Sequence, residues 1–282
     1  ANELADTLRQ LEIPDAWTHE IVRRKILFDQ ANFIRRCQAE PEVVRQELLA
    51  GVRAALGPGL EAEVDKHFSP RYRPWQQRIA FVPDADLFKA VRSGQASVVT
   101  DQIECFTPHG IQLQSGAHLE ADVVVTATGF HLNVLGDIHF SIDGQPLDFA
   151  RTVAWRGCMF TGVPNLAWVF GYLRASWTLR VDLVADFVCR LLNHMRQHGL
   201  PQCTPTLADA SMPLQPWNDL SSGYVQRAAH LLPKRGTKAP WLLKQNYLHD
   251  LLTLRYGRID DGAMVFSGPA VAAGTQPAEI EE

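Results

Sequence analysis

Several features are scarce or missing in this chain of 282 residues, and each absence argues against a class of protein. It has no run of about 18 apolar residues, which a helix needs to cross a bilayer. Its five cysteines include no Cys-x-x-Cys pair, so neither a zinc site nor a disulfide framework is indicated. A net charge of −4 does not favour nucleic acid as a partner. Reduced thiols and the lack of a signal-peptide pattern predict a cytoplasmic protein without a metal.

Two further motifs are absent. Without a Gly-x-Ser-x-Gly elbow, a hydrolase has no support. The chain also lacks a Gly-x-Gly-x-x-Gly turn between a strand and a helix, the arrangement that binds a dinucleotide pyrophosphate. The nearest match, Gly57-Pro-Gly59-Leu-Glu-Ala62, follows a charged helical segment, so we interpret it as a helix break. His194 and His198 have i,i+4 spacing but lack the glutamate of a zinc protease, which favours two histidines near a helix end over a metal site.

The most informative stretch is residues 121–130, Ala-Asp-Val-Val-Val-Thr-Ala-Thr-Gly-Phe. Its β-branched run predicts a strand over residues 123–126 that is buried on both faces, as in the parallel sheet of an α/β protein. Ala127, Thr128 and Gly129 follow, and such small residues allow a backbone to approach a ligand closely. A tight strand end without a ligand is the alternative.

The rest of the chain alternates between helical and strand patterns, which predicts a mixed α/β protein. Residues 1–66 are predicted to be helical, with Asp15 as an N-cap, and residues 67–83 to form an ordered loop. Ser176 is a second candidate N-cap. The predicted helices cover residues 15–37, 41–57, 84–93, 176–198 and part of 239–252, and the predicted strands cover residues 96–100, 102–107, 110–114, 117–119 and 166–170.

Several blocks of sequence carry a specific resemblance to one family. They are residues 68–78, 83–88, 96–129, 162–165, 171–172, 176–179, 224–235 and 255–261. Together they resemble the C-terminal half of a class B flavin monooxygenase of the Baeyer–Villiger type, and most of all the ethionamide-activating monooxygenase group. Members of that class carry one glycine-rich turn for FAD and a second for NADPH. The resemblance therefore implies an incomplete chain that begins inside the NADPH domain and lacks the N-terminal half.

The resemblance also implies a fold and a reaction. The fold is a partial two-dinucleotide-binding flavoprotein fold of the α/β class, without the N-terminal FAD Rossmann unit. Residues 1–66 and 67–122 would belong to the NADPH domain, residues 123–220 would return to the FAD domain, and residues 221–282 would form a C-terminal extension with a frayed tail. The whole enzyme would use FAD, NADPH and O2, and would act through a C4a-peroxyflavin. Its substrate would be a small apolar ketone, or a compound with an oxidisable sulfur or nitrogen.

Arg78 is the candidate catalytic residue. The resemblance places at this position, in Pro74-Trp-Gln-Gln-Arg78, a fixed positive charge that stabilises the peroxide anion. An arginine suits this role because it stays charged at any working pH and acts strongly in a dry site. The alternative is a structural arginine that pairs with Asp84 or Asp86.

The turn before the predicted helix 176–198 is the candidate flavin contact. Free N–H groups and the helix dipole favour an anion at such a helix start. The resemblance assigns this role to Gly171, Ser176 and Trp177, together with residues 127–129. Arg174 stands in this turn where the family has a different residue, so it could aid the anion or block the site. Plain capping of a core helix is the alternative.

Two tryptophans and one helix leave alternatives open. Trp75 and Trp177 could line an apolar substrate pocket or belong to the core. Residues 17–36 form a basic amphipathic helix that could lie on an anionic membrane or pack as an ordinary helix. A non-catalytic remnant that serves as an interaction or membrane-surface module is the second hypothesis for the chain. A flavoprotein reductase or N-hydroxylase is the third.

We predict that the isolated chain binds FAD weakly or not at all, because it has no glycine-rich turn to hold the pyrophosphate. The measurement is a visible absorption spectrum of the purified chain after FAD is added and the excess is removed. A tightly retained yellow cofactor would contradict the expectation.

Overall fold

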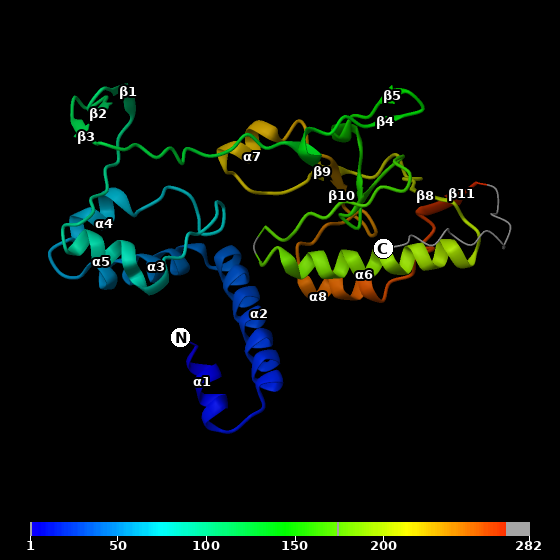
Figure 1. The fold of residues 1–282 in the computed structure, drawn as a ribbon, viewed down its shortest axis with the longest axis horizontal. Coiled ribbons are helices and arrows are strands. Elements are labelled where there is room, and N and C mark those ends of the chain that lie inside the picture. Colours follow the sequence, from blue (N-terminus) through cyan, green and yellow to red (C-terminus); the bar gives the residue numbers. More distant parts are fainter. Residues whose placement is uncertain (1, 174, 269–282) are drawn as a thin grey trace, which may run out of the picture. The chain divides into compact units, whose positions relative to one another are not determined.

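The computed structural model describes residues 2–173 and 175–268 of the chain, and it is mixed α/β as the sequence predicts. The chain divides into two compact units, Ala1–Phe130 and His131–Glu282 (Figure 1). We call them unit 1 and unit 2 and describe each by itself. All paired strands in the described residues run antiparallel, apart from two isolated parallel bridges.

Unit 1 is helical over its first two thirds, and the predicted helices are confirmed. Pro41 starts its helix in the first turn, where the missing N–H is tolerated. Pro14, and not Asp15, occupies the N-cap of the longest helix, and Asp15 is its first residue. The helices are α1 (Glu3–Gln10), α2 (Asp15–Ala39), α3 (Pro41–Leu56), α4 (Glu61–His67) and α5 (Asp86–Arg92), with a 3-10 turn η1 (Pro83–Ala85) before α5.

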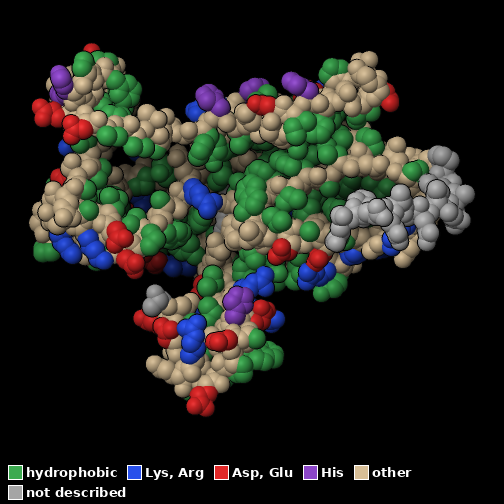
Figure 2. Space-filling view, viewed as in Figure 1, with side chains coloured by type: hydrophobic (Ala, Val, Ile, Leu, Met, Phe, Trp, Pro, Cys, Tyr) green, Lys and Arg blue, Asp and Glu red, His purple; other side chains and the backbone are tan. Residues whose placement is uncertain are grey.

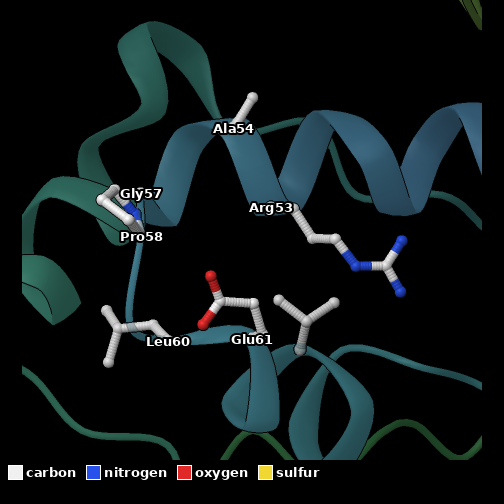
Figure 3. Close-up of a pocket in the computed structure, with 7 residues that line it drawn as sticks. Arg53, Ala54, Gly57, Pro58, Leu60 and Glu61 are labelled. Carbon is white, nitrogen blue, oxygen red and sulfur yellow. The ribbon is translucent and has the colours of Figure 1, made fainter.

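The glycine pair after α3 is the helix break that the sequence predicts. Gly57 and Gly59 both have positive φ, +83° and +86°, and a helix rather than a strand precedes them. A pocket of about 240 Å³ lies beside this break (Figure 3). The Glu61 carboxylate accepts the N–H of Gly59 at 3.2 Å. Its own backbone N–H, followed by that of Gly59, lowers the pKa of the carboxyl. The Gly59 N–H is thus bound by a carboxylate of the chain itself, and a helix precedes the break, so the break lacks the strand–turn–helix arrangement of a dinucleotide site.

A three-stranded meander follows the helices of unit 1. Its strands are β1 (Ile103–Thr107), β2 (Gly110–Leu113) and β3 (His118–Glu120), in the order β1-β2-β3. The three corresponding strand predictions are confirmed within two residues. The predicted strand over residues 96–100 is wrong, because that segment pairs with no neighbouring strand in the described part of the chain.

The valine-rich segment after the meander differs most from its prediction. Residues 123–126 form neither a helix nor a strand, and they are not buried. The exposed fractions of Val123 and Val125 are 78% and 85%, and Phe130 is exposed as well. A β-branched run becomes a central strand only when strands on both sides accept its backbone hydrogen bonds. No described residue of the chain supplies such a partner.

Unit 2 packs short hairpins around one long helix, α6 (Thr178–Gln197), which confirms the predicted helix 176–198. Asp143 and Gly144 form a two-residue hairpin turn with positive φ, as their residue types favour. The strands are β4 (Ser141–Ile142), β5 (Gln145–Pro146), β6 (Ala154–Trp155), β7 (Met159–Phe160), β8 (Gln202–Pro205), β9 (Leu214–Pro216), β10 (Lys234–Gly236) and β11 (Met264–Ser267). The remaining elements are η2 (Val134–Asp137), η3 (Phe149–Arg151), α7 (Gly223–Ala228), α8 (Tyr247–Asp250) and a π-helical turn, η4 (Leu251–Arg255).

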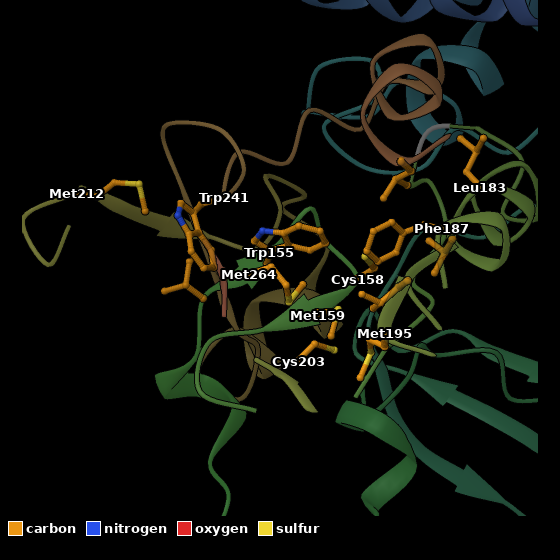
Figure 4. Close-up of a cluster of buried hydrophobic side chains, with 14 residues drawn as sticks. Trp155, Cys158, Met159, Leu183, Phe187, Met195, Cys203, Met212, Trp241 and Met264 are labelled. Carbon is orange, nitrogen blue, oxygen red and sulfur yellow. The ribbon is translucent and has the colours of Figure 1, made fainter. Parts of the chain in front are cut away.

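The apolar face of α6 organises the largest cluster of buried side chains in the described residues (Figure 4). Leu183, Val184, Phe187 and Leu191 recur at helical spacing and are all buried. The rings of Phe187 and Trp155 lie 5.3 Å apart between centroids, so the β6–β7 hairpin packs on the helix. A hydrophobic stripe read from the sequence therefore becomes the core of unit 2.

The predicted strand over residues 166–170 is wrong. This segment makes one strand-like backbone bond, from the Trp168 N–H to the Cys158 carbonyl at 2.7 Å, and no ladder. Its aromatic rings pack instead against Trp217, with centroids 5.2 Å and 5.5 Å from those of Trp168 and Phe170. Side-chain packing rather than sheet pairing holds it in place.

None of the helices in residues 2–173 and 175–268 has both the length and the apolar character that a membrane span requires.

Replacing Val123 and Val125 with threonine should reduce self-association of the chain without changing its melting temperature. Both side chains are exposed, so the apolar area they present favours association rather than folding. Light scattering and thermal unfolding measure the two effects. Val184→Thr is the control, because its side chain is fully buried and a buried hydroxyl without a partner costs about 1–3 kcal/mol. A wild-type chain that is already a monomer would refute the expectation.

Candidate functional site

A buried ion pair joins α6 to α8 in unit 2. The Arg180 side chain is completely buried, and its Nε donates to Asp250 Oδ2 at 2.9 Å. Asp250 is buried too, with 6% of its side chain exposed. A charge this far from water is tolerated only when a partner and hydrogen bonds replace the solvent.

The two terminal nitrogens of Arg180 bind backbone carbonyls. They donate to Gly157 at 3.0 Å, to Phe170 at 2.9 Å and to Arg156 at 2.7 Å. Gly157 has a φ of +63°, and a Cβ atom there would lie 2.7 Å from the guanidinium. Only glycine therefore fits where the chain passes the buried arginine.

Tyr172 completes this network. Its hydroxyl donates to Asp250 Oδ2 at 2.9 Å, so the tyrosine and Arg180 share one carboxylate oxygen. Burial, followed by the negative charge of Asp250, raises the pKa of Tyr172 well above its usual range. Burial also raises the pKa of the nearby Cys158 thiol to about 12. Both groups therefore stay protonated at neutral pH and act as neutral parts of the core.

A second set of arginine contacts attaches the last described segment to the hairpin and the helix. Arg156 donates to Asp261 at 3.0 Å and to the Thr253 carbonyl at 2.7 Å. Trp155 donates to the same Asp261 oxygen at 3.1 Å. From α6, Arg190 donates to two further carbonyls of this segment at 2.7 Å each. Backbone carbonyls at its turns are thus capped by charged donors.

The predicted flavin-facing turn lies directly beside the Arg180 network. Gly171 packs under Trp177, and a Cβ atom on Gly171 would approach the indole within 2.3 Å. Trp177 is half-exposed, and its ring lies 4.8 Å from that of Phe170. The structure therefore brings these two predicted residues together, with the indole at the surface of the turn. Arg174 lies outside the described residues.

The prediction that Ser176 is the N-cap is wrong. Trp177 occupies that position, and it makes no side-chain capping bond among the described residues. The Ser176 hydroxyl instead lies 3.0 Å from that of Thr178. Because the helix begins at Thr178, Ser176 precedes the cap position, and none of the described hydrogen bonds joins its hydroxyl to an N–H group of the first turn.

The other predicted residues belong to unit 1. Ala127, Thr128 and Gly129 are exposed, and Gly129 has a φ of +113° with open space around its Cβ position. Arg78 is exposed on the predicted loop, three residues after Trp75. Trp75 is itself buried against Cys37 and neighbouring side chains. Its core alternative therefore holds, and the pocket alternative for Trp75 is wrong.

No group of three or more possible metal ligands occurs in residues 2–173 and 175–268. The imidazoles of His194 and His198 stack with their centroids 4.3 Å apart, and His198 Nδ1 lies 2.8 Å from the His194 carbonyl. At this end of α6, the imidazole rings of His194 and His198 thus contact each other.

Sequence reasoning missed Arg180, Asp250 and Gln245, which connect the turn to the rest of unit 2. One signal was present for Arg180. It stands three residues before Leu183 and seven before Phe187, in the apolar stripe of α6, where a charge is unexpected. An arginine at such a position requires a buried acid elsewhere, but the sequence does not show which acid that is.

Three relatives match this chain along most of its length. AlmA from Acinetobacter baylyi, named as a FAD-binding monooxygenase, is 45% identical over 268 residues, which cover 93% of this chain and 52% of AlmA. EthA from Mycobacterium tuberculosis, named as a FAD-containing monooxygenase, is 42% identical over 90% of this chain and 52% of EthA. MymA from the same organism, also named as a FAD-containing monooxygenase, is 39% identical over 92% of this chain and 52% of MymA.

The chain thus spans about half the length of the relatives it matches. The resemblance to FAD monooxygenases that the sequence blocks indicate is confirmed. No family model matches the chain. No solved structure matches it either.

Arg180→Met should destabilise unit 2 by about 3–5 kcal/mol, because Asp250 would stay buried without its cationic partner. Thermal and urea unfolding followed by circular dichroism measure the loss. Arg258→Met is the matched control: it breaks an exposed ion pair, with Asp260 at 3.2 Å, which solvent screens. Equal melting temperatures for the two variants would show that the buried pair contributes little.

Proposed function

The chain is homologous to FAD-containing monooxygenases over about half of their length, and we propose that it is the C-terminal part of such an enzyme. The identity of 39–45% along about nine tenths of the chain is the observation that carries this proposal. The whole enzyme would be a class B monooxygenase of the Baeyer–Villiger type that also uses NADPH. The partial dinucleotide-binding fold, with its boundaries at residues 66, 122 and 220, belongs to the same proposal.

Within this proposal, the start of α6 in unit 2 would contact one edge of FAD, and the chain would not hold the pyrophosphate. The start of α6 has no side-chain cap in the described part, so its N–H groups suit an anionic ring edge. Gly129 offers exposed backbone with open space around it. The pyrophosphate needs a glycine-rich turn between a strand and a helix, and the only similar stretch, at Gly57, follows a helix and is capped by Glu61. We therefore assign to this chain the flavin edge and to the other half the pyrophosphate.

When bound, FAD supplies the activation of O2. The contribution of this chain would be a fixed positive charge and the exclusion of water. Arg78 would supply the charge, since a guanidinium keeps its proton at any working pH and stabilises an anionic oxygen strongly in a dry site. Trp177 would cover the flavin edge with its half-exposed ring. The substrate would be a small apolar ketone or a compound with an oxidisable sulfur or nitrogen.

The membrane-surface alternative rests on α2 and is weaker. Trp17 and Phe28 are exposed on this helix, as an interfacial helix requires. Four of its five lysines and arginines, however, pair with acids, among them Arg24 with Glu20 at 2.8 Å and Lys25 with Asp29. Acidic, basic and hydrophobic side chains are mixed over α1 and α2 on the face seen in Figure 2. The exposed apolar side chains of α2 suit the missing half of the enzyme better than an anionic lipid.

Arg78→Ala should abolish oxygen insertion and leave NADPH consumption measurable. Reduction of the flavin by hydride needs no stabilised anion, but oxygen transfer does, and one preorganised charge is worth on the order of 10²-fold in rate. The assay is the ratio of product formed to NADPH consumed in the reconstituted monooxygenase, in which this chain is joined to the N-terminal half that its relatives possess.

Two further variants sharpen this test. Arg78→Lys should restore little activity, because lysine lacks the planar fork of arginine. Arg71→Ala removes an exposed arginine from the same loop and should keep the wild-type ratio. If Arg78→Ala also keeps that ratio, Arg78 is a structural residue and its catalytic assignment is wrong.

A further inference from the structure

A segment far along the chain holds the turn before α6. This segment, residues 245–250, contains α8 and the two residues before it. Gln245 Oε1 accepts the backbone N–H of Leu173 at 2.9 Å. Asp250 accepts the Tyr172 hydroxyl at 2.9 Å, and Arg180, bound to the same carboxylate, donates to the Phe170 carbonyl at 2.9 Å. Two contacts thus hold Tyr172 and Leu173 from a segment more than 70 positions later. The third holds Phe170 through Arg180, which this segment binds in turn.

The conformation of Gln245 indicates that it is held in place. Its φ is +51°, a left-handed value that a residue with a Cβ rarely adopts. Such a conformation persists where the surroundings over-determine it, and it is frequent next to functional turns. The neighbouring Asn246 side chain accepts the N–H of His249 at 2.9 Å, so the start of α8 is capped.

The contacts have a direct consequence for the predicted flavin-facing residues. Gly171 lies between the two held positions, Phe170 and Tyr172, and packs under Trp177. The position of Gly171 and of the indole therefore depends on residues 245–250, although none of those residues belongs to the turn. A shift of the later segment would displace the backbone at the start of α6.

We propose that Gln245, Tyr172 and Asp250 are positioning residues that set the flavin-facing turn 170–173 for cofactor binding. This inference rests on the proposed function, since it requires that the turn faces FAD. It goes further by assigning the C-terminal segment a role in the cofactor site. Removal of one of these bonds leaves the core packed but allows the turn to move, so cofactor affinity falls more than stability.

The test compares FAD affinity with thermal stability in the reconstituted monooxygenase. Gln245→Met keeps the length of the side chain and removes the acceptor for Leu173, and Tyr172→Phe removes only the hydroxyl. Each should raise the Kd for FAD about 3- to 10-fold, the effect of one net hydrogen bond. Gln245→Glu retains an acceptor and should restore much of the affinity. Fluorescence titration with FAD and a melting curve on each protein give both quantities.

Gln226→Met is the matched control. It removes a comparable bond in unit 2, from Gln226 to the Leu220 carbonyl at 2.7 Å, which is remote in sequence from the turn. It should lower the melting temperature about as much as Gln245→Met and leave the FAD Kd unchanged. If Tyr172→Phe does not fold, the comparison of Gln245→Met with Gln245→Glu tests the positioning role without it.

The outcomes separate two kinds of failure. If the wild-type reconstituted protein binds no FAD, the proposed function is overturned and the positioning role with it. If it binds FAD and Gln245→Met has the wild-type Kd, only the positioning role is overturned. An equal rise in the FAD Kd for Gln226→Met would likewise overturn the positioning role. The weaker binding would then result from a general loss of stability and not from movement of the turn.

Discussion

The buried ion pair between Arg180 and Asp250 is the constraint on which unit 2 depends. The guanidinium has no access to water, so every one of its contacts must come from the protein. Those contacts are with the β6–β7 turn, the segment before α6 and α8. Segments up to about 90 residues apart in the sequence thereby contact the same Arg180 side chain. The directions of the guanidinium N–H groups fix how these segments lie relative to one another.

The same arrangement explains why unit 2 needs little regular sheet. Its strands are two to four residues long and form only two-stranded pairs in the described residues. Short ladders of this kind contribute little by themselves. Stability comes instead from the apolar face of α6, a set of packed aromatic rings and arginines that cap the carbonyls of turns. In this construction the turns are held by hydrogen bonds from buried or half-buried arginines.

In unit 1, by contrast, the last residues leave apolar side chains exposed. Its helices bury their own clusters, but the valine-rich segment is left in water. An apolar β-branched run in that state exposes its side chains to water, and its backbone has no strand partner among the described residues. A buried strand of this composition requires neighbouring strands on both sides, which the described residues do not provide. The segment that most clearly indicated the family is thus the one that differs most from its predicted form.

The sequence by itself determined the helices, the meander, the helix break at Gly57 and the relationship to FAD monooxygenases. All of these depend on local patterns: apolar periodicity, proline and glycine positions, and short blocks of residues. Only the tertiary structure decided that Val123 is exposed, that Trp75 belongs to the core and that Asp250 is the partner of Arg180. Burial and pairing depend on which distant segments meet, and a strand or a buried charge is stable only once its partner is present.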